Sequence, residues 1–93
     1  MARQDSAEML ALQALSWLAG NDDLMPVFLG STGLSAEEIA SRAAEPEFLG
    51  SVLDFILMDD VWVIAFCDSI GVRYEAPMQA RMALPGGAVE HWT

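Results

Sequence analysis

The stretch from Pro46 to Cys67, PEFLGSVLDFILMDDVWVIAFC, is the most apolar part of an otherwise acidic chain. Its hydrophobic residues fall on nearly every side of a helical projection, a pattern typical of helices covered on most faces by other segments. Pro46 suits the first position of a helix, where its missing amide is not needed. We therefore expect residues 46–58 to form the central helix of the fold, with the segments before and after packed around it.

One narrow side of this expected helix is polar. It follows i, i+4, i+7, i+11 spacing and consists of Glu47, Ser51, Asp54 and Met58. Asp59-Asp60 then interrupts the chain, and the apolar run Val61 to Cys67 fits either a buried strand or a buried helix. We favour a helix over 61–70, ended by Gly71, because the aspartates can cap it and an internal repeat places a helix here.

Capping residues also delimit the first two helices. The first is expected to begin with a capping box of Asp5 and Glu8 and to end at Gly20-Asn21. Its buried face is expected to comprise Leu10, Ala14, Trp17 and Leu18. The second helix is expected to run from a cap at Asp22-Asp23 to Gly33. Its core contacts are expected from Val27, Phe28 and Leu29.

Two shorter helices complete the expected bundle. Ser35 and Glu38 form a capping box that opens a helix over 35–44, with Ile39 as its anchor and Glu38 paired to Arg42 at i, i+4. The last helix is expected over 75–83, where Leu84-Pro85-Gly86-Gly87 stops regular structure.

The length of 93 residues allows one domain with a single modest core. We expect an all-α fold, a compact orthogonal bundle of five to six helices. The single domain spans 1–93, with an ordered core over about 5–84 and a flexible tail over about 85–93.

The chain resembles itself when residues 15–34 are aligned with residues 53–72. The matched pairs include Leu15 and Leu53, Asp22 and Asp60, Phe28 and Phe66, and Gly33 and Gly71. The pattern favours an internal duplication of a helical unit, with chance similarity between two alanine-rich segments as the alternative. Two units are too few for an open solenoid, so a closed bundle is expected.

The charge is strongly one-sided, with 14 acidic against 4 basic residues, no lysine and a net charge of -10. Such a surface repels nucleic-acid phosphates and anionic lipids, whose binding depends on Lys and Arg. We therefore expect no nucleic-acid and no membrane partner. A basic protein partner would be attracted, although negative charge also serves solubility.

A cytoplasmic location is expected. Cys67 is the only cysteine, so no internal disulfide can form, and a reducing compartment fits best. The N-terminus has acidic residues before any apolar run and is not a secretory signal. The longest uncharged stretch ends at Asp22 and is too short for a membrane helix, which needs about 20 apolar residues.

No catalytic, cofactor or metal site is expected. The acidic corners Asp22-Asp23 and Asp59-Asp60, with Glu45 and Glu47, lack the alternating ligands and glycine of a calcium loop, and capping explains both pairs. His91 has no second histidine to join it. Cys67 lies in an apolar run and is expected to be an inert core thiol.

Two further motifs are considered and set aside. Asp68-Ser69-Ile70 resembles the attachment site of acyl carrier proteins, but Gly71 follows at once, so Ser69 is expected at a helix end rather than opening one. Residues 34–43, LSAEEIASRA, resemble the first helix of a helix-turn-helix motif. The next segment, Glu45 to Phe48, is acidic and apolar, whereas a recognition helix is rich in Arg, Lys, Asn or Gln.

Three segments together resemble a known family. They are RAAEPEFLGSVLDFILMDD from Arg42, AFC over 65–67 and ARMALPGG over 80–87. They resemble domain-of-unknown-function family 3572, small proteins found mainly in alphaproteobacteria, and the likeness covers about residues 5–87. The resemblance implies a complete single-domain bacterial protein and no assigned activity, so it identifies no catalytic residue.

The expected function is protein binding without catalysis. The absence of a catalytic grouping and the acidic surface favour a binding or adaptor module that offers a helical surface to a protein partner. A hydrophobic content of 54% is high for so short a chain, so a homodimer interface is also considered. The alternative is an enzyme or ligand-binding protein that uses Asp54, Asp59 or Asp60 in a pocket.

Overall fold

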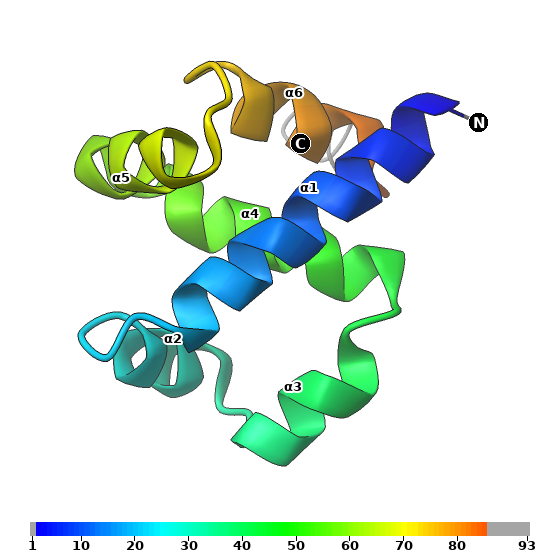
Figure 1. Cartoon of the computed structure of the whole chain (residues 1–93). Coiled ribbons are helices and arrows are strands. Elements are labelled where there is room, and N and C mark those ends of the chain that lie inside the picture. The colour runs from blue at the N-terminus through cyan, green and yellow to red at the C-terminus, as the bar shows by residue number, and fades with distance from the viewer. Residues whose placement is uncertain (1, 86–93) are drawn as a thin grey trace, which may run out of the picture.

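The computed structural model describes the backbone of residues 2–85 and the side chains of residues 4–85. Within that range the chain is all-α and has six helices (Figure 1). They are α1 (Ala2–Ala19), α2 (Met25–Thr32), α3 (Ala36–Arg42), α4 (Pro46–Leu57), α5 (Asp60–Ile70) and α6 (Ala76–Ala83). The expected helical bundle is confirmed, and so is the choice of helix over strand at 61–70. The expected tail, with His91, lies almost entirely outside the described residues.

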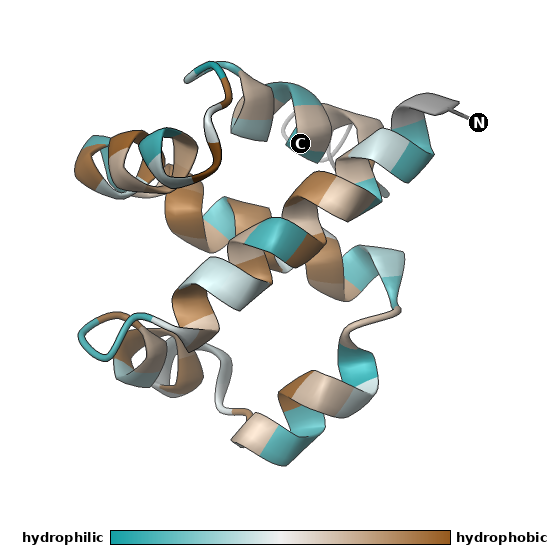
Figure 2. Ribbon diagram, viewed as in Figure 1, coloured by the Kyte–Doolittle hydropathy of each residue, from teal (hydrophilic) through white to brown (hydrophobic). Residues whose placement is uncertain are grey.

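The helices form a compact body of 31 × 26 × 26 Å. Helix α1 crosses over α4 at the centre, and α6 packs along α1 and also touches α4 (Figure 1). Helix α5 packs on α4, and α2 contacts the end of α1. The ribbon is mostly apolar along α4 and α5, whereas α1, α3 and α6 alternate between polar and apolar residues (Figure 2).

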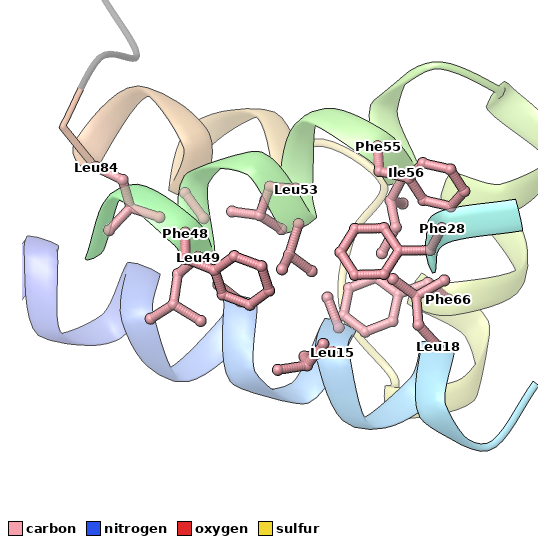
Figure 3. Packing of buried hydrophobic residues seen from close by; sticks show 14 of the residues in the cluster. Leu15, Leu18, Phe28, Phe48, Leu49, Leu53, Phe55, Ile56, Phe66 and Leu84 are labelled. Atoms are coloured by element: carbon pink, nitrogen blue, oxygen red, sulfur yellow. The ribbon is translucent and has the colours of Figure 1, made fainter. Parts of the chain in front are cut away.

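Helix α4 is the centre of the core, as expected. Seven of its twelve residues are buried: Phe48, Leu49, Gly50, Val52, Leu53, Phe55 and Ile56. The predicted polar stripe is confirmed, because Glu47, Ser51, Asp54 and Met58 are all exposed. Figure 3 shows the side chains of α4 meeting those of α1 and of Phe28 and Phe66 in one apolar cluster. Phe28 packs edge-on against Phe55, with ring centroids 5.1 Å apart.

The N-terminal end of α1 differs from the expectation. The helix begins at Ala2, so Asp5 lies inside it and the predicted capping box of Asp5 and Glu8 is wrong. Glu8 instead accepts a hydrogen bond from Gln4 Nε2 at 3.1 Å. Ala, Arg and Gln at positions 2–4 are good helix formers, which extend the helix past the candidate cap.

The buried face of α1 consists mainly of small residues: Ala7, Ala11, Ala14, Leu15 and Leu18. Of the predicted face, Ala14 and Leu18 are buried, while Leu10 and Trp17 are half-buried at its edges. Alanine takes little space, and the separation of packed helices depends on the side chains between them. The alanines therefore let α1 approach α4 and α6 closely.

The corner between α1 and α2 is held by Asn21 rather than by the aspartates. Asn21 Oδ1 accepts hydrogen bonds from the backbone amides of Asp23 and Leu24, both at 3.0 Å. The prediction that Asp22-Asp23 caps α2 is therefore wrong, because an asparagine one position earlier already binds these amides. Phe28 is buried as predicted, whereas Val27 is 49% exposed, since this short helix presents only one side to the core.

The capping box of α3 is confirmed. Ser35 Oγ accepts a hydrogen bond from the amide of Glu38, and Glu38 Oε1 accepts one from the amide of Ser35 at 2.8 Å. Ile39 is buried, as predicted. The helix ends at Arg42, before the predicted Ala44, and the Arg42 guanidinium lies 3.9 Å from the Glu45 carboxylate.

Two glycines end helices as expected. Gly33 and Gly71 adopt φ of 75° and 73° at the ends of α2 and α5, a conformation that side chains with a Cβ disfavour. These positions match in the proposed repeat, but the packing of the two units differs. Helix α6 packs along α1, whereas α3 has no comparably extensive partner within residues 2–85. The internal duplication stays an interpretation of the sequence.

Arg81 connects α6 to the polar stripe of α4. Its Nε donates a hydrogen bond to Asp54 Oδ1 at 2.6 Å, and its Nη1 donates to the carbonyl of Pro85 at 3.0 Å. The side chain is 15% exposed and crosses Gly50, where a Cβ would lie 2.8 Å from Nη1. A glycine in the middle of α4 is thus explained by the guanidinium packed on it.

This contact predicts that Gly50→Ala destabilises the protein when Arg81 is present and stabilises it when Arg81 is absent. Alanine is favoured over glycine inside a helix by about 1 kcal/mol, but here the new Cβ displaces Arg81 from Asp54 and Pro85. We expect Gly50→Ala to lower the free energy of unfolding by about 1 kcal/mol and, in an Arg81→Ala background, to raise it by about 1 kcal/mol. Urea unfolding measures both values. The same effect in both backgrounds would refute the role of Arg81.

The capping box predicts a pH-dependent contribution from Glu38. Hydrogen bonds from the Ser35 amide and hydroxyl, with a smaller contribution from the charge of Arg42, lower the pKa of Glu38 below 4.5. Because the folded pKa is depressed, the stabilisation is present above the ordinary pKa and is lost as the pH falls through the folded value. Glu38→Gln, which keeps an acceptor but not the charge, should lower the melting temperature near neutral pH and converge with the wild type in acid.

Glu37→Gln is the matched control for this measurement. It removes the same charge from the same first turn, but not a group bonded to Ser35. The melting-temperature difference between Glu38→Gln and Glu37→Gln should shrink as the pH falls below 4.5. A difference that stays constant down to acid pH would show that the charge of Glu38 does not act through the cap.

Candidate protein-interaction surface

Two of the three carboxylates weighed as catalytic groups, Asp54 and Asp59, are engaged in structural contacts. Asp54 is bonded to Arg81. Asp59 caps α5, because its Oδ1 accepts from the amide of Val61 at 2.9 Å, which confirms that predicted cap. Asp60 follows in the first turn, exposed to solvent. In the described part of the chain no three His, Cys, Asp or Glu side chains are grouped so that they could hold a metal ion.

Ser69 and Cys67 lie where the sequence places them. Ser69 is in the last turn of α5, and its hydroxyl donates to the carbonyl of Phe66 at 2.6 Å, so it does not open a helix as a carrier-protein serine does. Cys67 is fully buried. Burial raises the pKa of its thiol, and the negative charges of Asp68 and Glu75 raise it further, so the reactive thiolate is disfavoured.

Helix α5 is exposed where the sequence predicts it to be buried. Of the run 61–67, only Val63, Phe66 and Cys67 are buried. Val61 is 69% exposed and Ile64 43% exposed. Helix α5 lies at the edge of the body, and α4 is its main partner among the described helices (Figure 1). The prediction of a fully covered apolar run is therefore wrong, because α4, together with Trp17 of α1 against Phe66, covers only one side of α5.

The exposed residues of α5 form one continuous surface, which we call the α5 face. Val61, Ile64 and Ala65 follow i, i+3, i+4 spacing and form its apolar centre. Asp60 and Asp68 stand at its two ends, both exposed, and the last turn of the helix carries no basic residue. The α5 face is thus an apolar stripe with a negative charge at each end.

Tyr74 extends the acidic end of this surface. Its hydroxyl donates a hydrogen bond to Asp68 Oδ1 at 2.9 Å, and half of the side chain is exposed. This bond to a carboxylate, and the charge of Asp68, raise the pKa of Tyr74. The bond positions an aromatic ring beside Asp68.

A second exposed surface lies between α1 and α6. It is a hollow of about 670 Å³, which we call the α1–α6 groove. The residues that line it are Ser6, Ala7, Leu10, Ala76, Gln79, Ala80, Met82 and Ala83. None of these side chains is charged. Met9 and Met78 are also exposed on the two helices, and flexible methionines suit surfaces that adapt to a partner.

Comparison with known families matches residues 4–87 to a family described as a protein of unknown function, DUF3572. The chain belongs to this family. The resemblance seen in the sequence is therefore confirmed over almost its whole length. No curated protein and no solved structure matched the chain.

None of the helices that the structure describes in this DUF3572 chain is long and apolar enough to cross a membrane.

The residues of the α5 face were missed as a surface because every position in the run 61–67 is apolar. A hydrophobic pattern with no polar side cannot show which side faces water. The flanking acids were the available signal, because Asp60, Ile64 and Asp68 are spaced by four residues and share one side of a helix. Two acids on that side are difficult to bury.

The exposure of α5 predicts that valine-to-alanine substitutions at positions 61 and 63 change the free energy of unfolding by different amounts. Val61→Ala, on the α5 face, should change the free energy of unfolding by less than about 0.5 kcal/mol. Val63→Ala, facing the core, should lower it by about 2 kcal/mol. Urea unfolding followed by circular dichroism measures both. Equal losses at the two positions would show that Val61 is also buried.

Proposed function

We propose that this DUF3572 protein is a small binding or adaptor protein, without catalysis of its own, that docks a basic segment of a partner protein on the α5 face. The observation that carries the proposal is the exposed apolar stripe of Val61, Ile64 and Ala65 between Asp60 and Asp68. A partner helix with apolar residues three and four positions apart would cover such a stripe.

The apolar centre and the acidic ends would contribute differently to binding. Full burial of a side chain such as valine or isoleucine is worth about 1.5–3 kcal/mol, so Val61 and Ile64 would supply affinity. The acids would orient the partner and speed its approach. With 14 acidic against 4 basic residues, long-range attraction favours a basic partner.

Few basic side chains lie near the α5 face to neutralise the negative charges of Asp60 and Asp68. Of the four arginines, Arg81 is held by Asp54, Arg42 lies beside Glu45, and Arg73 lies 3.6 Å from Glu75. Lys and Arg side chains of a partner would therefore meet Asp60 and Asp68 without competition from a basic residue of α5 itself. We place the protein in the cytoplasm, where a single unpaired cysteine is expected.

Affinity capture with charged variants tests this function. The wild type, the double variant Val61→Glu/Ile64→Glu and the control Val27→Glu are used to capture proteins from the native cells. Val27 is 49% exposed on α2, away from the α5 face, so the control adds a similar charge to a similarly exposed valine. We expect one basic protein to bind the wild type and the control, and at least about tenfold weaker binding by the double variant.

The captured partner is then purified and titrated against the three proteins. Binding between opposite charges is screened by salt, so the dissociation constant should rise from low to high ionic strength. Equal binding by the double variant and the control would exclude the α5 face. A wild type that captures no protein but copurifies with a small molecule would overturn the adaptor function.

A further inference from the structure

We infer that the α1–α6 groove is the contact surface of a homodimer, and that a second copy of this chain is its occupant. This inference concerns a different surface from the α5 face and does not depend on the proposed partner. It rests on the form of the groove, on the chemistry of its lining and on the net charge of the chain.

The groove has a floor of small side chains and a rim of long ones. Ala7, Ala80 and Ala83 lie within it, while Met82, at its edge, is 56% exposed. An alanine floor leaves room for side chains that enter from outside, and a methionine can adjust its three rotatable bonds to fill that room. A rim methionine of one copy can therefore enter the alanine floor of the other.

The lining of the groove carries no charge that would repel the same lining in a second copy. A twofold dimer brings the same patch of both copies together, so every charged residue at its centre meets its own charge again. Each chain carries a net charge of -10, but the side chains that line the groove are uncharged. Two acidic chains can meet here without placing like charges opposite each other at the centre of the interface.

The other exposed surface lacks this property. In an antiparallel pairing of two α5 faces, Asp60 of each copy would approach Asp68 of the other. Like charges placed directly opposite each other are destabilising. The acid-ended α5 face therefore suits a basic partner, and the uncharged α1–α6 groove suits a second copy.

The acids nearest to the groove lie at its margin. Asp5 lines the adjoining hollow with Met9, and Glu8 is bonded to Gln4 on the same helix. Glu75 lines a separate hollow at the start of α6. Repulsion between such rim charges is screened by salt. Self-association should consequently strengthen as salt is added, whereas binding of a basic partner to the α5 face should weaken.

A stable dimer would extend beyond the groove onto the neighbouring exposed sides of α1 and α6. A standard interface covers about 800 Å² on each partner, which is about one seventh of the 5694 Å² exposed by the chain. Helix α1 has 18 residues and is therefore about 27 Å long. An interface of that size would therefore cover the groove and the exposed side chains of α1 and α6 on either side of it.

Light scattering and sedimentation velocity on the purified full chain test the dimer. The wild type is measured from about 10 μM to 1 mM, the range in which weak dimers form, at low and high sodium chloride. We expect a mass that rises from 10.1 kDa toward twice that value with concentration, and a dissociation constant that falls several-fold as salt increases. A wild type that stays monomeric at the highest concentration and salt overturns the inference.

Charged variants of the groove locate the interface. Met82→Glu and Gln79→Glu each add a negative charge that a twofold dimer would place near its copy, so dimerisation should weaken at least about tenfold. Met58→Glu makes the same change as Met82→Glu at a 73% exposed methionine outside the groove and should leave the mass unchanged. Circular dichroism confirms that each variant is folded.

Two outcomes would assign the groove differently. If folded Met82→Glu and Gln79→Glu dimerise as the wild type does, the dimer uses another surface and the inference is wrong. If the wild type and both variants are all monomeric, and the two variants no longer bind the basic partner, the groove binds that partner. The inference of a homodimer is then also wrong. Loss of partner binding only in Val61→Glu/Ile64→Glu leaves the dimer measurement unaffected, so the two proposals can fail separately.

Discussion

The close packing of α1 across α4 is the contact on which the other helices depend. It is formed by a face of α1 rich in alanine and by the large side chains of α4, which leaves little space between the two helices. Phe28 of α2 and Phe66 of α5 lie next to each other in the same cluster, beside Leu18 and Ile56, as Figure 3 shows. Helix α6 then lies along α1, so the groove between them follows directly from that crossing.

Most of the fold could be predicted from residues that act locally. Gly33 and Gly71 end helices because of their own backbone freedom, and the Ser35–Glu38 box needs only four residues of sequence. The prediction failed at Asp5 and at Asp22-Asp23, where several residues could serve as the cap. Helix formers before Asp5, and Asn21 before the aspartates, decided those corners. Several caps are possible locally at these corners, and the neighbouring residues decide which of them forms.

The sequence predicts that the surface of the protein is acidic, but it does not predict that the exposed apolar stripe lies on α5. Acidity follows from composition, whereas the exposure of Val61 and Ile64 depends on how many helices surround α5. The number of helices packed around α5 is set by the topology, and it cannot be inferred from a run in which every residue is apolar. The alanine floor of the groove is hidden for a similar reason, since Ala7 and Ala83 belong to helices far apart in the sequence and meet only after folding.

Arg81 has a consequence for how the protein opens. Because one side chain bonds both Asp54 of α4 and the carbonyl of Pro85 after α6, the end of α6 cannot leave the body without disturbing the middle of α4. The guanidinium also covers α4 at Gly50, where the helix has no side chain of its own. Amides of α4 and α6 should therefore exchange with solvent deuterium as one slow cooperative unit, while those of α3, which has few packing contacts, exchange earlier.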